Sequence, residues 1–192
     1  MAKISSLKNM VVTLLLITFI AAVALGAAYV LTEKPIAAAR LAKINQAIAE
    51  VTPPFDNSPS DEAKEVSIDG RTLRLFPAKK GGALVGIAVE TATTKGFGGL
   101  ITLMVGFLPD GAIYNTSVIA HAETPGLGDK IDKSKSDFSV QFEGKNPDSF
   151  KLAVKKDGGD VDAITASTIS SRAFCDAVER AYRAVKIMNY EL

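Results

Sequence analysis

A long uncharged segment near the N-terminus constrains this chain more than any other feature. The 22 residues from Met10 to Leu31 include no charged side chain. A helix rises 1.5 Å per residue, so this segment would be about 33 Å long, enough to cross the hydrocarbon core of a bilayer. Lys3 and Lys8 precede it. Because positive residues tend to stay on the cytoplasmic side, we expect the N-terminus inside the cell and the remaining chain outside.

A cleaved signal peptide is the alternative to a membrane anchor, since the small residues Ala24, Gly26 and Ala28 lie near the end of the segment. The apolar part of a signal peptide is typically about 7–15 residues long. This segment is longer, so we expect a retained, single-pass span in the cytoplasmic (inner) membrane. The predicted parts are a cytoplasmic N-terminus, a transmembrane helix, a connecting helix and loop, and an extracytoplasmic domain, at residues 1–9, 10–31, 32–65 and 66–192.

Composition excludes several classes of function. The sequence of 192 residues has a formal net charge of +1, so no basic surface for nucleic acid is expected. It contains one cysteine, Cys175, and one histidine, His121. A single cysteine cannot form an intrachain disulfide or attach a c-type haem, and these two residues make no metal-binding cluster. We expect no metal site, and we expect Cys175 to be a buried structural residue.

Turn signals divide the rest of the chain into an α+β pattern. Asp69-Gly70 and Gly81-Gly82 predict tight turns between strands, and Pro109-Asp110-Gly111 predicts another. Apolar residues at helical spacing predict one helix that ends before Pro53-Pro54 and a second at the C-terminus. We therefore predict an antiparallel sheet packed by helices. The predicted helices are 35–51 and 169–189, and the predicted strands are 66–68, 73–76, 83–91, 100–108, 112–120 and 151–155.

The segment from Thr165 to Ser171 is dense in hydroxyl side chains and directly precedes the helical pattern. The first turn of a helix has unpaired backbone N–H groups and the positive end of the helix dipole, and both favour a phosphate. Ser170 and Ser171 could add hydroxyl donors, and Arg172 could add positive charge. The alternative is that these hydroxyls only cap the helix.

Two glycine-containing loops adjoin predicted strands. Lys95-Gly96-Phe97-Gly98-Gly99 leads into strand 100–108, and His121-Ala122-Glu123-Thr124-Pro125-Gly126-Leu127-Gly128 follows strand 112–120. Glycine allows the backbone to come close to a flat ring, although it serves equally well in a plain turn. An apolar platform with a few polar partners is typical of a cofactor site.

The segment Asp162-Ala163-Ile164-Thr165-Ala166-Ser167-Thr168 and the two loops together resemble the FMN-binding domain family over about residues 66–185. The segment is similar to the family's flavinylation motif D-x-x-[ST]-[GA]-[AS]-T, and the second loop resembles the H-x-E-T-P-G-L-G loop of its Rnf and Nqr members. The resemblance implies FMN bound covalently to Thr168 through a phosphoester. It also implies that an ApbE-like flavin transferase recognises Asp162, which is otherwise a turn residue. The family often has Gly at Ala166 and Ala at Ser167.

The resemblance implies a set of flavin contacts. The predicted cofactor-binding residues are Gly98, Gly99, His121, Glu123, Thr124, Gly126, Leu127, Gly128, Thr165, Ser167, Thr168 and Ser170. Glu123 would orient the loop or the ring, with a plain surface carboxylate as the alternative. His121 would form a hydrogen bond or only pack, and Gly98 and Gly99 would contact the flavin or serve only the turn.

The resemblance also implies a redox function without a catalytic nucleophile or acid–base pair. The implied protein is an electron-transfer subunit of the Rnf complex, an ion-translocating ferredoxin:NAD+ oxidoreductase. Its implied partners are the other subunits of a membrane redox complex and the flavin transferase. The alternatives are an Nqr-type subunit of a sodium-translocating NADH:quinone oxidoreductase, a stand-alone membrane-tethered FMN module, and a non-redox anchor or assembly protein with the same fold.

Overall fold

The computed structural model describes residues 7–190, and the side chains up to Met188. The predicted cytoplasmic segment 1–9, with Lys3, therefore lies mostly outside the described residues. The chain divides into two compact units, Met1–Ala42 and Lys43–Leu192. Each unit is described below by itself.

The first unit is formed by the helix α1, which extends from Leu7 to Val51 and so continues into the second unit. Its N-terminal part is long and apolar enough to cross a membrane, and its apolar side chains are exposed. The sequence predicted a separate helix starting at Pro35, but α1 passes through Pro35 without a break. Proline removes only one backbone hydrogen bond, and the good helix formers around it, mostly Ala and Leu, favour continuation. The helix ends before Pro53-Pro54, as predicted.

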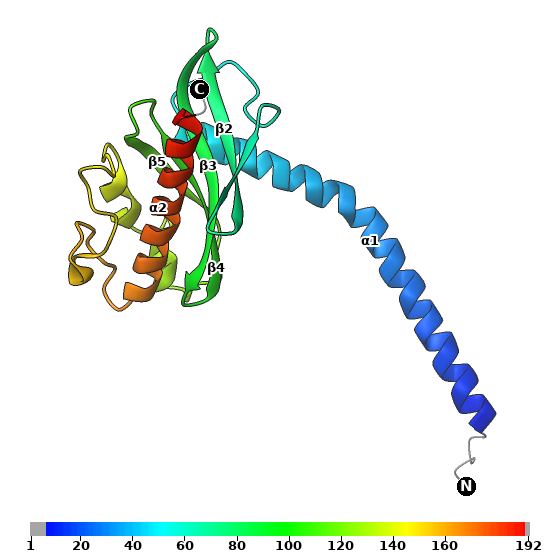
Figure 1. The fold of residues 1–192 in the computed structure, drawn as a ribbon. Helices are drawn as coiled ribbons and strands as arrows, with labels where there is room; N and C mark the ends of the chain where they lie inside the picture. The colour runs from blue at the N-terminus through cyan, green and yellow to red at the C-terminus, as the bar shows by residue number, and fades with distance from the viewer. Residues whose placement is uncertain (1–6, 191–192) are drawn as a thin grey trace. The chain divides into compact units, whose positions relative to one another are not determined.

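The second unit is built on a five-stranded antiparallel sheet in the order β1-β2-β3-β4-β5 (Figure 1). Asp69 and Gly70 connect the first two strands with φ angles of 51° and 73°. Both angles are positive, as a tight type I′ hairpin requires. The predicted α+β fold is confirmed. The strands are β1 (Lys64–Ile68), β2 (Arg71–Lys80), β3 (Ala83–Gly96), β4 (Gly99–Phe107) and β5 (Ile113–Ala120).

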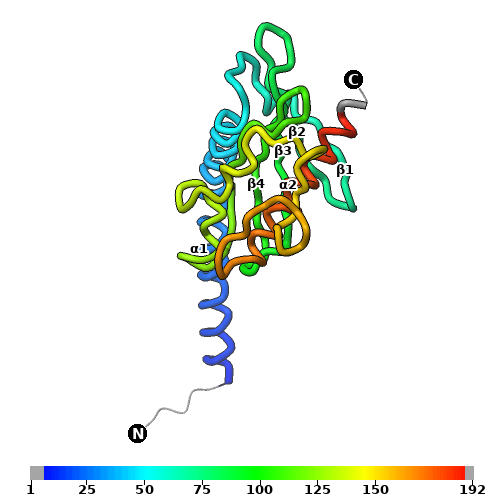
Figure 2. Tube along the Cα trace, turned by 90° about the vertical axis from the view of Figure 1, so that its left-hand side faces the viewer, coloured from blue at the N-terminus to red at the C-terminus, as the bar shows by residue number. Residues whose placement is uncertain are grey.

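The helix α2 (Thr168–Tyr190) runs along one face of this sheet (Figures 1 and 2). Its apolar side, which includes Phe174 and Val178, packs in one buried cluster with Leu103 and Val105 of β4. Thr91 of β3 donates a hydrogen bond to the Ala177 carbonyl at 3.1 Å. β3 continues to Gly96, beyond residue 91 where the sequence predicted its end, because Ala92 and Thr93 still pair with β4.

The opposite face of the sheet packs against the last turns of α1. Ile44, Ile48 and Val51 form a second buried cluster with residues of β2, β3 and β4, including Met104. Met104 lies between Leu103 and Val105 in β4, so its side chain points to the opposite face, as alternation along a strand requires. Gly106 of β4 faces Val51 so closely that a Cβ there would overlap the Val51 carbonyl.

Residues 121–167 connect β5 to α2 without a further strand. They contain three short 3₁₀ helices, Gly128–Ile131, Asp137–Phe142 and Lys155–Asp157. The predicted strand 151–155 is wrong, because Val154 forms only an isolated parallel bridge with Val161. The turn at Gly158 and Gly159 returns the chain after a few residues, which is too short for the crossover that a parallel ladder needs.

Candidate functional site

A cavity of about 350 Å³ lies where the β3–β4 turn, the loop after β5 and the start of α2 meet. Figure 1 shows the β3–β4 turn and the start of α2 at the same end of the domain. The volume is within the range typical of small-molecule sites. Its wall contains seven of the predicted residues, namely Glu123, Thr124, Leu127, Gly128, Ser167, Thr168 and Ser170, and three that were not among the predicted contacts, Phe97, Ala166 and Ile169.

The hydroxyl groups at the start of α2 have different partners. Ser167 Oγ donates to Ser170 Oγ at 2.9 Å, and Ser170 Oγ donates to Glu123 Oε2. Ser171 Oγ donates to the Ser167 carbonyl and accepts from the Ile164 N–H, both at 3.0 Å. Thr168 has no side-chain hydrogen bond to any residue in the described part of the chain. Among the described hydroxyls at the start of α2 that line the cavity, it is the one without a partner; the Thr124 hydroxyl, on the loop after β5, also lines the cavity without a hydrogen bond.

The backbone at this helix start is also available to an anion. The first helical hydrogen bond joins the Ser171 N–H to the Ser167 carbonyl at 3.1 Å. Within the described residues, the N–H groups of Thr168, Ile169 and Ser170 have no acceptor, as expected for a first turn. Ser167 occupies the capping position, but its hydroxyl bonds to Ser170 Oγ rather than to these N–H groups. The hydroxyl of Ser167 therefore does not cap the helix, and the free N–H groups could bind a phosphate.

The turn into α2 depends on an unusual backbone conformation at Ala166. Its φ angle is 61°, in the left-handed region that disfavours residues with a Cβ. Such a conformation costs roughly 1–3 kcal/mol for a residue other than glycine. This geometry explains why glycine suits the position in the motif, and Ala166 adopts it at a cost in backbone strain.

Glu123 is buried in the cavity wall, with 5% of its surface exposed. Its Oε1 accepts from the Gly98 N–H at 2.9 Å, and its Oε2 accepts from Ser170. The alternative of a plain surface carboxylate is therefore wrong. A Cβ at Gly96 or Gly128 would overlap the carboxylate oxygens. Gly128 thus makes room for Glu123, whereas the sequence alone suggested that this glycine allows close approach of a ring.

The other predicted glycines and His121 lie outside the cavity wall. Gly99 and Gly126 have φ angles of 94° and 77°, so glycine is needed there for the backbone turn. Gly98 packs directly against the Ala122 carbonyl, where a Cβ would not fit. His121 accepts from the Glu123 N–H through Nδ1 at 3.1 Å. These residues shape the two loops that hold Glu123.

The remaining residues of the proposed motif are on the surface beside the cavity. Asp162 is exposed and pairs with Lys155 at 2.8 Å. Thr165 is also exposed and borders a separate, open depression with Asp162. Arg172 forms two hydrogen bonds with Asp157, at 2.6 and 2.7 Å, and these lower the pKa of the Asp157 carboxyl. Arg172 therefore adds no charge to the cavity, contrary to the expectation from sequence.

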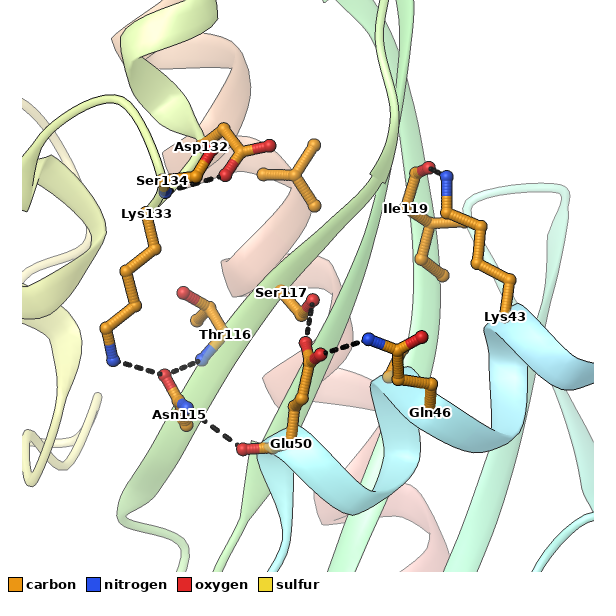
Figure 3. Close-up of a pocket in the computed structure, with 12 residues that line it drawn as sticks. Lys43, Gln46, Glu50, Asn115, Thr116, Ser117, Ile119, Asp132, Lys133 and Ser134 are labelled. Carbon is orange, nitrogen blue, oxygen red and sulfur yellow. Dashed lines mark hydrogen bonds between the residues drawn. The ribbon is translucent and has the colours of Figure 1, made fainter.

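A larger groove of about 460 Å³ runs along the outer edge of β5 (Figure 3). Several of its polar groups bond to one another: Asn115 Nδ2 donates to the Glu50 carbonyl at 2.9 Å, and Ser117 Oγ donates to Glu50 Oε2 at 2.8 Å. Lys43 donates to the Ile119 carbonyl. Such contacts protect an edge strand from pairing with another chain. We therefore assign the functional site to the cavity at α2.

That cavity fits a ligand with a flat apolar part and an anionic group. Phe97, Leu127 and Ile169 are 71%, 42% and 48% exposed, so they offer an apolar surface. The described residues contain no group of His, Cys, Asp and Glu that could hold a metal ion. Cys175 is buried, as predicted, and burial raises the pKa of its thiol to about 12.

Comparisons with known proteins agree with this geometry. The profile of the FMN-binding domain matches residues 96–183, which include the whole cavity wall. The RnfG protein of Erwinia tasmaniensis, a subunit of an ion-translocating oxidoreductase complex, is 42% identical over 140 residues, covering 68% of this chain and 67% of the relative. The RnfG protein of Cereibacter sphaeroides is 33% identical over 171 residues, covering 86% and 78%.

Coverage is lower for other relatives. The RnfG protein of Vibrio atlanticus is 40% identical over 136 residues, which is 64% of the relative, and for the Shewanella baltica protein the matched part is 51% of its length. The chain thus spans between about half and four fifths of the relatives that it matches. The extent of the Erwinia and Cereibacter matches is nonetheless decisive: the chain belongs to the RnfG family of ion-translocating oxidoreductase complex subunits and contains its FMN-binding domain.

Proposed function

We propose that this chain carries FMN covalently on Thr168 and transfers electrons as a subunit of an ion-translocating ferredoxin:NAD+ oxidoreductase complex. One observation carries the proposal: the unbonded Thr168 hydroxyl lies in the wall of an apolar cavity, on the first turn of α2. The relatives, which by name are subunits of ion-translocating oxidoreductase complexes, support membership in a multi-subunit assembly.

The chain's own residues would hold the flavin in three ways. The free N–H groups at the start of α2 would bind the phosphate, because they point toward an anion and carry the positive end of the helix dipole. Phe97, Leu127 and Ile169 would cover the apolar ring system. Glu123, held by Gly98 and Ser170, would fix the loop against the helix. FMN itself, when bound, supplies the electron-accepting and electron-donating chemistry.

Attachment would need a second protein. A bond forms between Thr168 Oγ1 and the FMN phosphorus, and the hydroxyl loses its proton. The donor would be a flavin dinucleotide, whose pyrophosphate bond breaks so that the nucleoside monophosphate leaves with the proton. A flavin transferase would catalyse this step. Asp162 and Thr165 are exposed beside the cavity, which supports a role for this surface in recognition by the transferase.

The proposed location is the outer side of the cytoplasmic membrane. The apolar part of α1 would be the single span, and Lys3 and Lys8 would remain in the cytoplasm. Protease added to intact spheroplasts should then degrade the FMN domain and leave the anchor. Protection of the domain until the membrane is broken would contradict this topology.

The proposed function is tested by purification from the native membrane with mild detergent. We expect a complex with other membrane subunits, with yellow fluorescence that stays on this chain after denaturation. A chain without flavin would contradict the cofactor assignment, and a flavin-bearing chain that purifies alone would contradict membership in the complex.

A further inference from the structure

Glu123 is a buried carboxylate without a positive side chain beside it. It is the only ionisable residue among those that line the cavity, and no Lys, Arg or His of the described chain forms an ion pair with it. A buried charge is usually paired, because its transfer from water is costly. An unpaired one in a cofactor site therefore needs an explanation.

The structure stabilises this charge with dipoles. Both oxygens accept hydrogen bonds, from the Gly98 N–H and from Ser170 Oγ, which is the pattern of an ionised carboxylate. Ser170 lies on the first turn of α2, where the helix dipole favours a negative group. Ser167 donates in turn to Ser170, so the donor chain points toward Glu123.

The surrounding backbone is shaped to this side chain. A Cβ at Gly96 would overlap Glu123 Oε1, and a Cβ at Gly128 would overlap Glu123 Oε2 and Ser170 Oγ. Glycines on two separate loops thus leave room for the carboxylate and for little else. The carboxylate is surrounded by the β3–β4 turn, the loop after β5 and the start of α2. These are the same three segments that form the cavity.

We propose that Glu123 is a positioning and tuning residue whose negative charge lowers the redox potential of the flavin. This inference rests on the proposed function, that FMN occupies the cavity. Reduction adds negative charge to the flavin, and a carboxylate in the same cavity opposes that change. Burial keeps water and salt ions away from the carboxylate, so its field is weakly screened. Serine and glycine dipoles hold the charge without neutralising it.

The test compares the midpoint potential of the flavin in the wild-type complex and in the Glu123→Gln variant. Glutamine keeps the shape of the side chain and can still accept from Gly98, while it removes the charge. We expect flavin to be attached and its potential to be higher, with a lower thermal midpoint because the buried Ser170 hydroxyl loses its charged acceptor. The difference should persist when the salt concentration is raised, because the site is buried. Glu50→Gln is the matched control, since Glu50 lies in the separate groove at β5.

Ser170→Ala is a second test of the same inference, for the case that the Glu123→Gln chain does not accept flavin. Ser170→Ala removes a donor to the carboxylate, so the charge is less compensated and the potential should fall, opposite to the glutamine variant. Equal potentials in the wild type and in whichever of these variants carries flavin would overturn the inference. That result differs from failure of the proposed function, in which the wild-type chain itself carries no flavin.

Discussion

The Thr168→Val change separates flavin attachment from folding more sharply than any other perturbation. Valine keeps the branched shape of threonine and removes only the hydroxyl oxygen. Thr168 makes no side-chain hydrogen bond to the described residues, so no buried partner is left unsatisfied. Threonine and valine also have similar helix propensities. We expect a loss of stability of no more than about 0.5 kcal/mol, as for a substitution that breaks no specific contact.

The thermal midpoint should therefore fall by no more than about 2 °C, since about 1 kcal/mol shifts a domain of this size by about 2–4 °C. Flavin attachment, in contrast, should be lost completely. The assay is in-gel flavin fluorescence of the denatured chain, together with a thermal melt of the folded protein. Thr165→Val is the matched control, because Thr165 is an exposed hydroxyl outside the cavity wall and should leave attachment intact. Full fluorescence in the Thr168→Val chain would refute the reasoning.

Three further predictions concern the packing around the site. Ser171→Ala leaves the Ile164 N–H without its acceptor and should cost about 1–3 kcal/mol, measured by urea unfolding; an unchanged midpoint would mean that the loop before α2 contributes no stability. Gly106→Ala places a Cβ against the Val51 carbonyl and should destabilise the domain by about 1–3 kcal/mol, with a wild-type melting curve as the contrary result. The Cys175 thiol, with its pKa raised to about 12 by burial, should react with alkylating reagents at pH 8 only after unfolding, and rapid labelling of the native chain would contradict its burial.

Local sequence signals were sufficient for much of the fold. The hairpin at Asp69-Gly70 follows from turn chemistry that involves only adjacent residues, and the apolar face of α2 follows from helical spacing. Helix and strand ends depend on contacts that are distant in sequence. The extension of β3 is paired with β4, and within it Thr93 bonds to Asp176, 83 residues away, a contact that no local pattern reveals.

The site could be predicted in part for the same reason. A dense run of hydroxyls before a helix predicts an anion site, but the sequence does not reveal which hydroxyl is both free and in the cavity wall. Ser171 bonds back to the Ser167 carbonyl, and Ser170 bonds to Glu123. Glu123 lies on another loop, so local sequence does not reveal this contact. Phe97 was missed as part of the cavity wall because the glycines on both sides of it are typical of a plain turn. In the folded chain the Phe97 side chain is 71% exposed and lines the cavity. Neither fact can be read from the local sequence.

The most direct test of the central claim is a peptide mass from the native source. Trypsin should release residues 157–172, which contain Thr165, Ser167, Thr168, Ser170 and Ser171. We expect this peptide to carry the mass of FMN less one water, with fragment ions that assign the modification to Thr168. An unmodified peptide, or a modification on any of the other four hydroxyls, would contradict the account.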